Sequence, residues 1–351
     1  MKTAFLLLFC VTLTHAYHFS SFGSLGLKRL HSHSSHPPSH PPSTSALSAE
    51  RTFAFSKYHG LGNDFVLVND LDKDAPSLTS EESAKICDRN FGVGGDGLIF
   101  AHKSKKEGYD FKMTIYNSDG TEPEMCGNGI RALAQFVVDE TGLSDKLPVT
   151  FNIDTLAGPI LPQVNEDRSI RVDMGYPIFT AAEIPTTLAA NYEDGGVVEQ
   201  TVDVGGGKTV KVSCVSMGNP HCVVFNEDKL IEDEEFNVVG AALESHDVFP
   251  ANTNVEFVYV DSPSHLTMKV FERGAGPTLA CGTGACALVV SAVRAGKIPS
   301  AKDGITVTLP GGDLVIHWAG EGEKVYMTGP AVMAFKGDCV VDLVKRGAKT
   351  N

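Results

Sequence analysis

The sequence lacks several features that would point to other kinds of protein. It has no C-x-x-C spacing, so we expect no structural zinc site and no other bound metal. It has no basic excess, since 29 Lys and Arg against 43 Asp and Glu give a formal net charge of −14, whereas nucleic-acid-binding proteins carry a basic footprint. Beyond the N-terminus, no apolar run approaches the length that spans a bilayer. We expect a soluble globular protein whose partner is a small molecule rather than a nucleic acid or a membrane.

Acidic residues are missing from residues 17–49, which are rich in Ser, His and Pro. Before them, Lys2, an apolar core over Ala4–Leu13 and a small-residue ending are typical of a cleavable signal peptide, residues 1–16. A Ser-rich segment without acids is typical of a transit peptide, here residues 17–50. A signal followed by a transit segment resembles the two-step import of algae with secondary plastids. We therefore expect the plastid stroma, with secretion as the alternative.

The cysteine count favours a reducing compartment. Removal of the signal peptide takes Cys10 and leaves seven of the eight cysteines, an odd number with no short-spaced framework. Small secreted proteins that depend on disulfides show the opposite pattern, and cytosolic or stromal proteins keep their thiols reduced. The cysteines of the mature chain are therefore expected to be free thiols.

Two of these thiols stand in nearly identical settings 155 positions apart, Cys126 and Cys281. Both begin the pattern C-G-x-G-x-x-A-L and run into an apolar stretch at helical spacing. The GNDFV sequence at Asn63 resembles the GNPHCV sequence at Asn219, at an offset of 156. Several matches at a nearly constant offset indicate an internal duplication. The two half-molecules would then present equivalent thiols across a pseudo-twofold axis.

The pattern of elements predicts an α+β fold of two pseudo-symmetric lobes, each a mixed β-sheet curled around a central helix. A helix that is apolar nearly all round is a buried helix, and each half contains one that begins at its cysteine. We expect an N-terminal lobe over 51–175 and a C-terminal lobe over 176–334, with 335–351 as a segment that can return to the first lobe. Strands are predicted at 53–58, 65–68, 98–101, 111–116, 149–153, 170–174, 197–204, 210–215, 222–225, 255–260, 267–271, 305–309, 314–317 and 325–329; helices are predicted at 79–89, from 126, at 233–243 and at 284–295.

Two thiols at two helix starts suit acid–base chemistry at a carbon next to a carboxylate. A helix N-terminus offers unpaired N–H groups and a partial positive charge, so it binds carboxylates and lowers the pKa of a nearby thiol. Two such ends that meet could hold one carboxylate between two thiols. Cys126 or Cys281 would remove the α-proton as thiolate, and the other would return a proton to the opposite face.

The two copies differ where a second charged group would bind. Under the duplication, Asn117 stands opposite Glu272 and Ser118 opposite Arg273. The planar fork of an arginine suits a carboxylate, and a glutamate can bind an ammonium group or alter a thiol pKa. A surface ion pair is the structural alternative for these two residues. The asymmetry predicts a substrate with a second charged end away from the reacting carbon.

Five blocks of the sequence resemble the diaminopimelate epimerase family, in the family's order, over about residues 53–345. The resemblance implies a cofactor-independent, usually dimeric epimerase that interconverts LL- and meso-2,6-diaminopimelate in lysine biosynthesis. The blocks are Lys57–Asn69 (KYHGLGNDFVLVN), Arg89–Gly97 (RNFGVGGDG), Tyr116–Arg131 (YNSDGTEPEMCGNGIR), Ser216–Val223 (SMGNPHCV) and Phe271–Ala285 (FERGAGPTLACGTGA).

The same resemblance implies roles for individual residues. Cys126 and Cys281 match the acid–base thiols, and His221 and Glu272 match residues that tune them. Gly97 departs from the pattern, because many bacterial members carry a substrate-contacting Gln there, which a water or a backbone group could replace. Substrate binding is implied for Asn63, Asn117, Gly127, Asn128, Asn219, Asn254, Glu272, Arg273, Gly282 and Thr283.

Two other functions remain open from the sequence. Proline racemases and hydroxyproline epimerases also use two thiols, but they usually follow the first cysteine with Gly-His, where this chain has Gly127-Asn128. They also have no need of Arg273. A thiol switch without catalysis, in which Cys126 and Cys281 form a reversible disulfide, is the alternative from another class. Such a switch does not account for Asn63, Asn219, Glu272 and Arg273.

Overall fold

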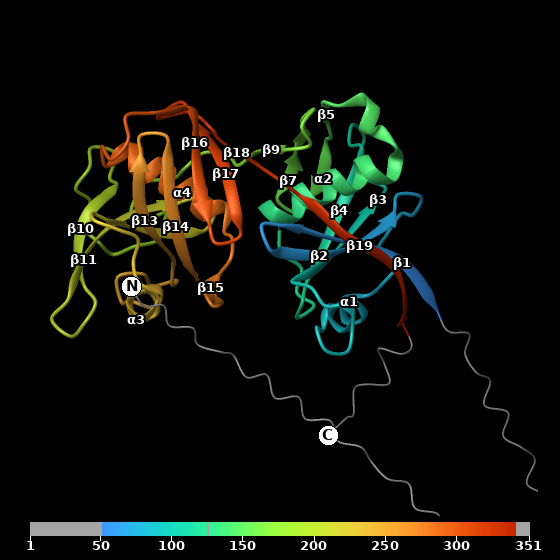
Figure 1. Ribbon diagram of the computed structural model, residues 1–351, viewed down its shortest axis with the longest axis horizontal. Helices are drawn as coiled ribbons and strands as arrows, with labels where there is room; N and C mark the ends of the chain where they lie inside the picture. Colours follow the sequence, from blue (N-terminus) through green and yellow to red (C-terminus); the bar gives the residue numbers. More distant parts are fainter. Residues whose placement is uncertain (1–50, 125, 342–351) are drawn as a thin grey trace, which may run out of the picture. The chain divides into compact units, whose positions relative to one another are not determined.

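The protein is described by a computed structural model that covers residues 51–341 except residue 125. The predicted signal and transit segments, 1–16 and 17–50, lie outside the described residues. The described part contains four α-helices and two β-sheets of seven and twelve strands (Figure 1). This is the α+β fold, dominated by sheet, that the sequence predicts. No helix in this part of the chain is long and apolar enough to cross a membrane.

The first sheet is built mostly from the first half of the chain. Its strands pair both parallel and antiparallel, so it is a mixed sheet. In spatial order they are β19 (Val332–Val340), β1 (Thr52–Gly60), β2 (Asn63–Asp70), β3 (Gly97–His102), β4 (Phe111–Asn117), β6 (Ile153–Thr155) and β7 (Gly158–Ile160).

The second sheet is also mixed and is built mostly from the second half. The short strand β15 (Gly276–Thr278) pairs with β14 off the main path. In spatial order the others are β10 (Val197–Asp203), β11 (Thr209–Ser216), β12 (Pro220–Asn226), β13 (Asn254–Ser262), β14 (His265–Glu272), β16 (Ala301–Leu309), β17 (Gly312–Trp318), β18 (Val325–Gly329), β9 (Ile170–Asp173), β8 (Gln163–Val164) and β5 (Val149–Thr150).

The helices begin where the sequence carries N-terminal signals. At the start of the first helix, Thr79 and Glu82 form a reciprocal capping box. At the two apolar helices, the residue that caps the N-terminus is a cysteine. The helices are α1 (Ser80–Cys87), α2 (Gly127–Thr141), α3 (Asp233–Glu244) and α4 (Gly282–Arg294), and a 3₁₀ turn, η1, covers Leu143–Lys146.

The order of elements shows the duplication that the sequence predicts. β1, β2, α1, β3, β4 and α2 repeat as β11, β12, α3, β13, β14 and α4, with the same antiparallel, parallel and antiparallel pairings. After each apolar helix the next long-range pairing is again parallel, β4 with β6 and β14 with β16. Equivalent residues of the two copies can therefore be compared by their strand register.

The two halves exchange strands near their ends. β19, close to the end of the described chain, pairs with β1 in the first sheet, while β9 and β8 from the first half pair with β18 and each other in the second. The single strand predicted at 149–153 is wrong, because β5 joins the second sheet and β6 the first. The lobe boundaries 51–175 and 176–334 stay a prediction.

Both apolar helices lie in the core, as their composition predicts. From Asn128 to Val138 every residue of α2 is buried, and α4 is buried from Gly284 to Ala292. In Figure 1, α2 lies against β1, β2 and β3, and α4 against the strands around β13 and β17. Side chains of both helices belong to one hydrophobic cluster. Such burial of Val, Leu and Ile side chains, at about 1.5–3 kcal/mol each, fixes the two helix starts in place.

Candidate active site

The two cysteine-capped helix starts open onto one cavity of about 940 Å³. Residues from both sheets line it, including an arginine and a glutamate from the second half and asparagines from both halves. All of the predicted site residues line it except His221 and Asn254. The lining set is Asn63, Asn117, Cys126, Gly127, Asn128, Asn219, Glu272, Arg273, Cys281, Gly282 and Thr283, with Gly62, Phe65, Arg89, Asp96, Glu124, Ala157, Met217, Gly218, Ala275, Thr278, Leu279 and Ala280.

The two thiols occupy equivalent positions at their helices. Cys126 caps α2 with φ −138° and ψ 115°, and Cys281 caps α4 with φ −127° and ψ 107°. Each Sγ accepts a hydrogen bond from the backbone N–H three residues on, of Gly129 and Gly284, at 3.4 Å in both cases. The hydroxyl of Thr283 lies a further 3.5 Å from Sγ of Cys281. Both cysteines are free thiols, as the sequence predicts.

The surroundings of the thiols differ in charge. Burial raises the pKa of Cys126; the backbone N–H groups of Gly129 and Asn128 and the charge of Arg131 oppose this rise. Burial raises the pKa of Cys281 well above its usual value, and the carboxylates of Glu272 and Glu256 raise it further. Burial therefore outweighs the lowering of the thiol pKa that a helix N-terminus is predicted to cause, and at neutral pH the thiolate fraction of each cysteine is below that of an exposed cysteine.

The first residue of each of these helices, a glycine, faces one side chain that packs between the two helix starts. A methyl group at Gly127 would lie 3.4 Å from Cε of Met327, and one at Gly282 would lie 2.9 Å from its Sδ. A methyl group at Gly282 would also lie 3.7 Å from Oδ1 of Asn128. The two helix starts therefore approach each other across Met327 of β18.

His221 lies behind the lining residues in a fully buried dyad. Its Nδ1 is 2.7 Å from Oε1 of Glu256, and its Nε2 is 2.9 Å from Oδ1 of Asn219. Because an amide oxygen only accepts, Nε2 carries a proton and the amide nitrogen of Asn219 is left for the cavity. A methyl group at Gly284 would lie 2.7 Å from Oε1 of Glu256 and 3.2 Å from Sγ of Cys281. The dyad therefore stands directly behind the second thiol.

Asn254 also supports a lining residue rather than lining the cavity. Its Oδ1 accepts from the backbone N–H of Arg273 at 3.0 Å, and its amide nitrogen donates to the Pro220 carbonyl at 2.9 Å. Nη1 of Arg273 donates to the Ala251 carbonyl at 3.2 Å, so the guanidinium is held at the mouth of the cavity with its remaining donors exposed. Burial raises the pKa of Glu272, while a hydrogen bond from the Thr278 hydroxyl opposes the rise.

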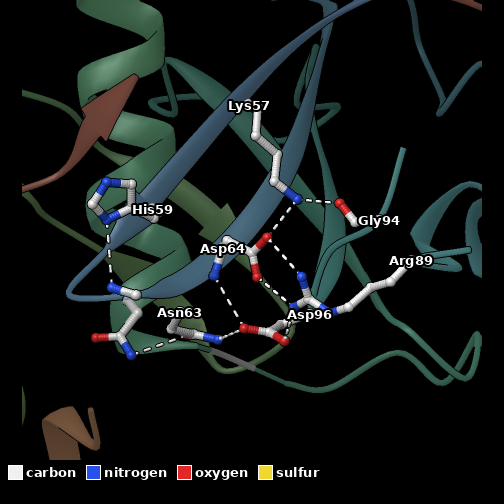
Figure 2. A network of polar contacts seen from close by, with 9 residues as sticks. Lys57, His59, Asn63, Asp64, Arg89, Gly94 and Asp96 are labelled. Carbon is white, nitrogen blue, oxygen red and sulfur yellow. Dashed lines mark hydrogen bonds and ion pairs between the residues drawn. The ribbon is translucent and has the colours of Figure 1, made fainter. Parts of the chain in front are cut away.

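Asn63 is held by a network of charged groups on the first sheet (Figure 2). Its amide nitrogen donates to Oδ2 of Asp96 at 2.7 Å, and the same oxygen accepts from the backbone N–H of Asp64 at 3.0 Å. Nη2 of Arg89 bridges the two carboxylates at 2.6 and 2.7 Å. On the far side, the nearly buried Lys57 pairs with Asp64 at 2.6 Å. The network fixes one wall of the cavity.

Removing the central carboxylate of this network should destabilise the fold. Burial raises the pKa of Asp64, but hydrogen bonds and charge from Arg89 and Lys57 outweigh it and lower the pKa to about 2. Since the folded pKa lies below the unfolded value, the stabilisation is present above about pH 4 and is lost as pH falls toward 2. Asp64→Asn should therefore lower the free energy of unfolding by about 2 kcal/mol at neutral pH.

Urea unfolding of the wild type and the variant, at neutral pH and near pH 3, measures this difference. Glu107→Gln, at an exposed position outside the network, is the control and should leave stability unchanged. Equal stabilities of Asp64→Asn and the wild type at neutral pH would contradict the prediction.

Gly97 cannot be replaced without movement of the backbone around it. A methyl group there would lie 2.8 Å from the Tyr116 carbonyl oxygen and 3.4 Å from the Phe65 ring. Gly97 pairs with Phe65 as Asn254 pairs with His221, so Asn254 is its equivalent in the second copy. At this position the second copy therefore has an asparagine side chain and the first copy has none.

Three residues of the site have no role in the sequence-based prediction. Asp96 and Arg89 line the cavity, Asp96 accepts from Asn63 and Arg89 pairs with Asp96, and Glu256 holds His221. The sequence feature that could have pointed to Asp96 is its place between two glycines. For Glu256 the signal is a carboxylate in an otherwise apolar strand, since such a residue is buried only when it is paired.

Within 51–341, leaving out 125, no group of three or more His, Cys, Asp or Glu side chains is arranged to hold a metal ion. The donors that converge on the cavity are suited to a carboxylate.

The fold defines a class of proteins with solved members. One is a *Bacillus anthracis* phenazine biosynthesis protein of the PhzF family, with TM-score 0.58 and 19% identity over 83% of this chain and 99% of that one. Another is a hydroxyproline epimerase from *Agrobacterium vitis*, with TM-score 0.57 and 13% identity over 83% and 93%. At these identities the likeness shows the fold alone.

Sequence comparison places the chain within this class. The sequence profile of diaminopimelate epimerase matches residues 55–180 and 213–334. Diaminopimelate epimerase of *Acaryochloris marina* is 50% identical over 81% of this chain and 97% of its own length. The chloroplastic diaminopimelate epimerase of *Oryza sativa* subsp. *japonica* is 49% identical over 83% of this chain and 81% of its own length. The chain belongs to the diaminopimelate epimerase family.

Proposed function

We propose that this protein interconverts LL- and meso-2,6-diaminopimelate by proton transfer between two cysteines, without a cofactor. The observation that carries the proposal is that Cys126 and Cys281 cap two helices and line one cavity. Family membership supports the substrate, and the charged groups at the cavity mouth suit its second amino-acid end. The product serves lysine biosynthesis, as in the family that the sequence resembles.

The reacting carboxylate would bind at the two helix starts. Backbone N–H groups at Gly127, Asn128, Gly282 and Thr283 are unpaired within their helices and lie at the positive ends of two helix dipoles. These groups stabilise the negative charge that spreads onto the carboxylate when the α-proton leaves. No electron sink beyond these donors is required by the scheme.

Each thiol acts once in each turnover. The thiolate takes the α-proton to become a thiol, and the electron pair of the broken C–H bond stays on the α-carbon and its carboxylate. The opposite thiol then gives its proton to the other face and becomes the thiolate. Because one group must be ionised and the other protonated, kcat/KM is expected to rise with pH and then fall as the second thiol ionises.

The distal end of the substrate would be held by the groups in which the two copies differ. Arg273 would bind the second carboxylate through its exposed donors, and Asn219 and Asn117 would bind with their amides. Glu272 would bind an ammonium group or act on the charge of Cys281. His221 and Asn254 would act from behind, through Asn219 and Arg273.

Turnover of LL-diaminopimelate in D2O tests the proposal. The scheme predicts that solvent deuterium appears at one α-carbon of the product, because the proton delivered comes from a thiol that exchanges with water. Mass spectrometry of the product measures it, and the second α-carbon of each molecule serves as an internal control. Epimerisation without deuterium uptake would contradict a two-thiol mechanism.

Proline should not be turned over. Proline lacks the second charged end that Arg273 and Glu272 would bind. It would therefore bind without the contacts that these two residues offer. Brisk racemisation of proline would move the protein to the function of the hydroxyproline epimerase whose fold it shares.

We further propose a homodimer that covers β19. This edge strand of the first sheet exposes 49%, 41% and 49% of Val332, Met333 and Phe335, and an exposed apolar edge strand tends to pair with another chain. Phe335→Asp should therefore shift the protein from dimer to monomer in sedimentation velocity. Phe91→Asp is a matched control, because Phe91 is 69% exposed and belongs to the segment between α1 and β3, not to this edge strand. A dimer unchanged by Phe335→Asp would contradict the proposal.

The plastid stroma is the proposed location. The relative from rice is named chloroplastic, and a reducing stroma would keep Cys126 and Cys281 in the thiol and thiolate forms that the mechanism uses. The signal at 1–16 and the transit segment at 17–50 would direct the import. Fluorescence microscopy of residues 1–50 fused to a reporter tests this location.

A further inference from the structure

One buried charge is present in the first copy of the duplicated helix and absent from the second. The offset of 155 that aligns Cys126 with Cys281 places Arg131 opposite Cys286. Both side chains are fully buried, one in α2 and the other in α4. The start of α2 therefore has a guanidinium one turn behind its thiol, and the start of α4 has a neutral thiol in that place.

The contacts of Arg131 are all with neutral acceptors. Nη2 donates to Oδ1 of Asn128 at 2.9 Å, Nη1 to the Gly127 carbonyl at 3.3 Å and Nε to the Pro330 carbonyl at 3.4 Å. Among residues 51–341 apart from 125, no carboxylate forms an ion pair with it. Burial lowers the pKa of Arg131 to about 10, so the group is still a cation at neutral pH. A buried cation without an anion is costly.

The ionisable groups whose charge acts on Arg131 are two thiols, Cys126 at the site and Cys286 in α4. Burial raises the pKa of Cys286 to about 12, so Cys286 is neutral at neutral pH and the site is the remaining source of an anion. The charged groups that line the cavity are Arg89, Asp96, Glu124, Glu272 and Arg273. Of the charged groups that act on the Cys126 thiol, Arg131 favours the thiolate and Glu272 opposes it.

The second thiol has no such cation. Glu272 and Glu256 both act against ionisation of Cys281. At the position equivalent to Glu256, the first copy has Ile99, whose Cδ1 would lie 3.1 Å from a methyl group at Gly129. These differences in charge between the copies favour negative charge at the first thiol over the second. The hydroxyl of Thr283, 3.5 Å from Sγ of Cys281, acts in the opposite direction but carries no charge.

Arg131 also fixes the direction of a chain of hydrogen bonds across the cavity wall. Its guanidinium can only donate, and the ionised Asp96 at the other end can only accept. Between them, Asn128 accepts from Arg131 and donates to Oδ1 of Asn63 at 3.0 Å, and Asn63 donates to Asp96 at 2.7 Å. The amide orientations are thus set by the two ends. Each amide keeps a second N–H for an anion in the cavity.

We propose that Arg131 is a positioning residue that makes Cys126 the first of the two thiols to ionise and aims the amides of Asn128 and Asn63 at a bound carboxylate. In the active form of the protein, Cys126 is then the thiolate and Cys281 carries the proton. After one turnover the proton lies on Cys126, and exchange with water restores this form. The proposal rests on the proposed acid–base roles of the two cysteines.

The order in which the two thiols ionise tests the proposal without turnover. Alkylation of each cysteine by iodoacetamide, followed peptide by peptide across a pH series, gives a midpoint for Cys126 and another for Cys281. The midpoint is set by ionisation and not by access to the reagent. In the wild type, Cys126 is expected to ionise first. If Cys281 ionises first, the proposal is wrong.

Variants separate the charge of Arg131 from its packing. Arg131→Met should raise the Cys126 midpoint by at least about one unit, which lowers its alkylation rate at neutral pH by about tenfold. Arg131→Lys keeps the charge, so it should keep the midpoint but raise KM, because the bond to Asn128 is lost. An unmoved Cys126 midpoint in a folded Arg131→Met protein overturns the proposal. If that protein does not fold, a shifted midpoint in Arg131→Lys overturns it.

Arg294→Met is the matched control. Arg294 lies at the other end of α4 with its side chain 4% exposed, and it is paired with Asp194 at 2.7 Å. Its loss should lower stability and leave the Cys126 midpoint in place, whereas a purely structural role of Arg131 predicts the same result for both variants. If the midpoints follow the expected order but no epimerisation occurs, the proposed function fails and the assignment of Arg131 stands.

Discussion

Replacing either Cys126 or Cys281 by alanine should reduce kcat/KM for diaminopimelate by at least about a thousandfold. A positioned acid or base contributes about 10²–10⁴-fold to a proton transfer, and groups that act as a unit lose nearly all of their effect when one is removed. Each thiol caps its helix through a long, weak contact from the backbone. The fold should therefore survive the substitution, and circular dichroism measures this.

The remaining thiol in each variant gives a sharper result than loss of rate. With Cys126 alone present, one stereoisomer should still exchange its α-proton with D2O, and with Cys281 alone the other should do so. Cys286→Ala is the control, because Cys286 is buried one turn behind Cys281 and does not line the cavity. A near-wild-type rate in either alanine variant would rule out two-base catalysis.

Arg273→Met should reduce kcat/KM for diaminopimelate by about a hundredfold, which corresponds to loss of one or two hydrogen bonds to a charged group at about 1.5–3 kcal/mol each. The guanidinium is anchored by Ala251 and by Asn254 through the backbone, so its exposed donors are preorganised for a carboxylate. Arg273→Lys should lose less, because the charge stays but the planar fork is lost.

The choice of substrate gives the control for Arg273. Analogues of diaminopimelate that lack the distal carboxylate should be turned over poorly by the wild type and equally poorly by Arg273→Met. In both cases the contact between the Arg273 guanidinium and the distal carboxylate is absent. Arg168→Met, which removes an arginine outside this cavity, should change neither rate. Full selectivity for diaminopimelate in Arg273→Met would contradict the assigned role.

The parts of the molecule that could be predicted from sequence are those where a local pattern decides the structure. Cys126 and Cys281 could be found because the glycines that follow each cysteine allow a tight helix entry and because the pattern occurs twice. The apolar strands were placed by their residue types alone. The meeting of the predicted site residues in one cavity follows from the duplication, since equivalent helix starts have equivalent places in their lobes.

The parts that could not be predicted depend on partners far apart in the chain. Glu256 meets His221 across 35 residues, and no local pattern tells which buried carboxylate has a histidine beside it. The segment at 149–153 divides between two sheets because the chain crosses there, which residue type does not signal. β19 exposes its apolar side chains, so the rule that apolar residues are buried gives no guide to its pairing with β1.

The exchange of β9 and β19 between the sheets bears on how the chain folds and on what its two halves can do. Each sheet is complete only when a strand from the other half has arrived, so many native contacts join residues that are far apart in sequence, and folding of high contact order is slow. Neither half would be expected to fold alone. Because both halves belong to one chain, equivalent positions in the two halves can carry different residues. In two identical subunits they cannot. A single chain can therefore place Arg131 and Arg273 on one side each, and a symmetric dimer of half-size chains cannot.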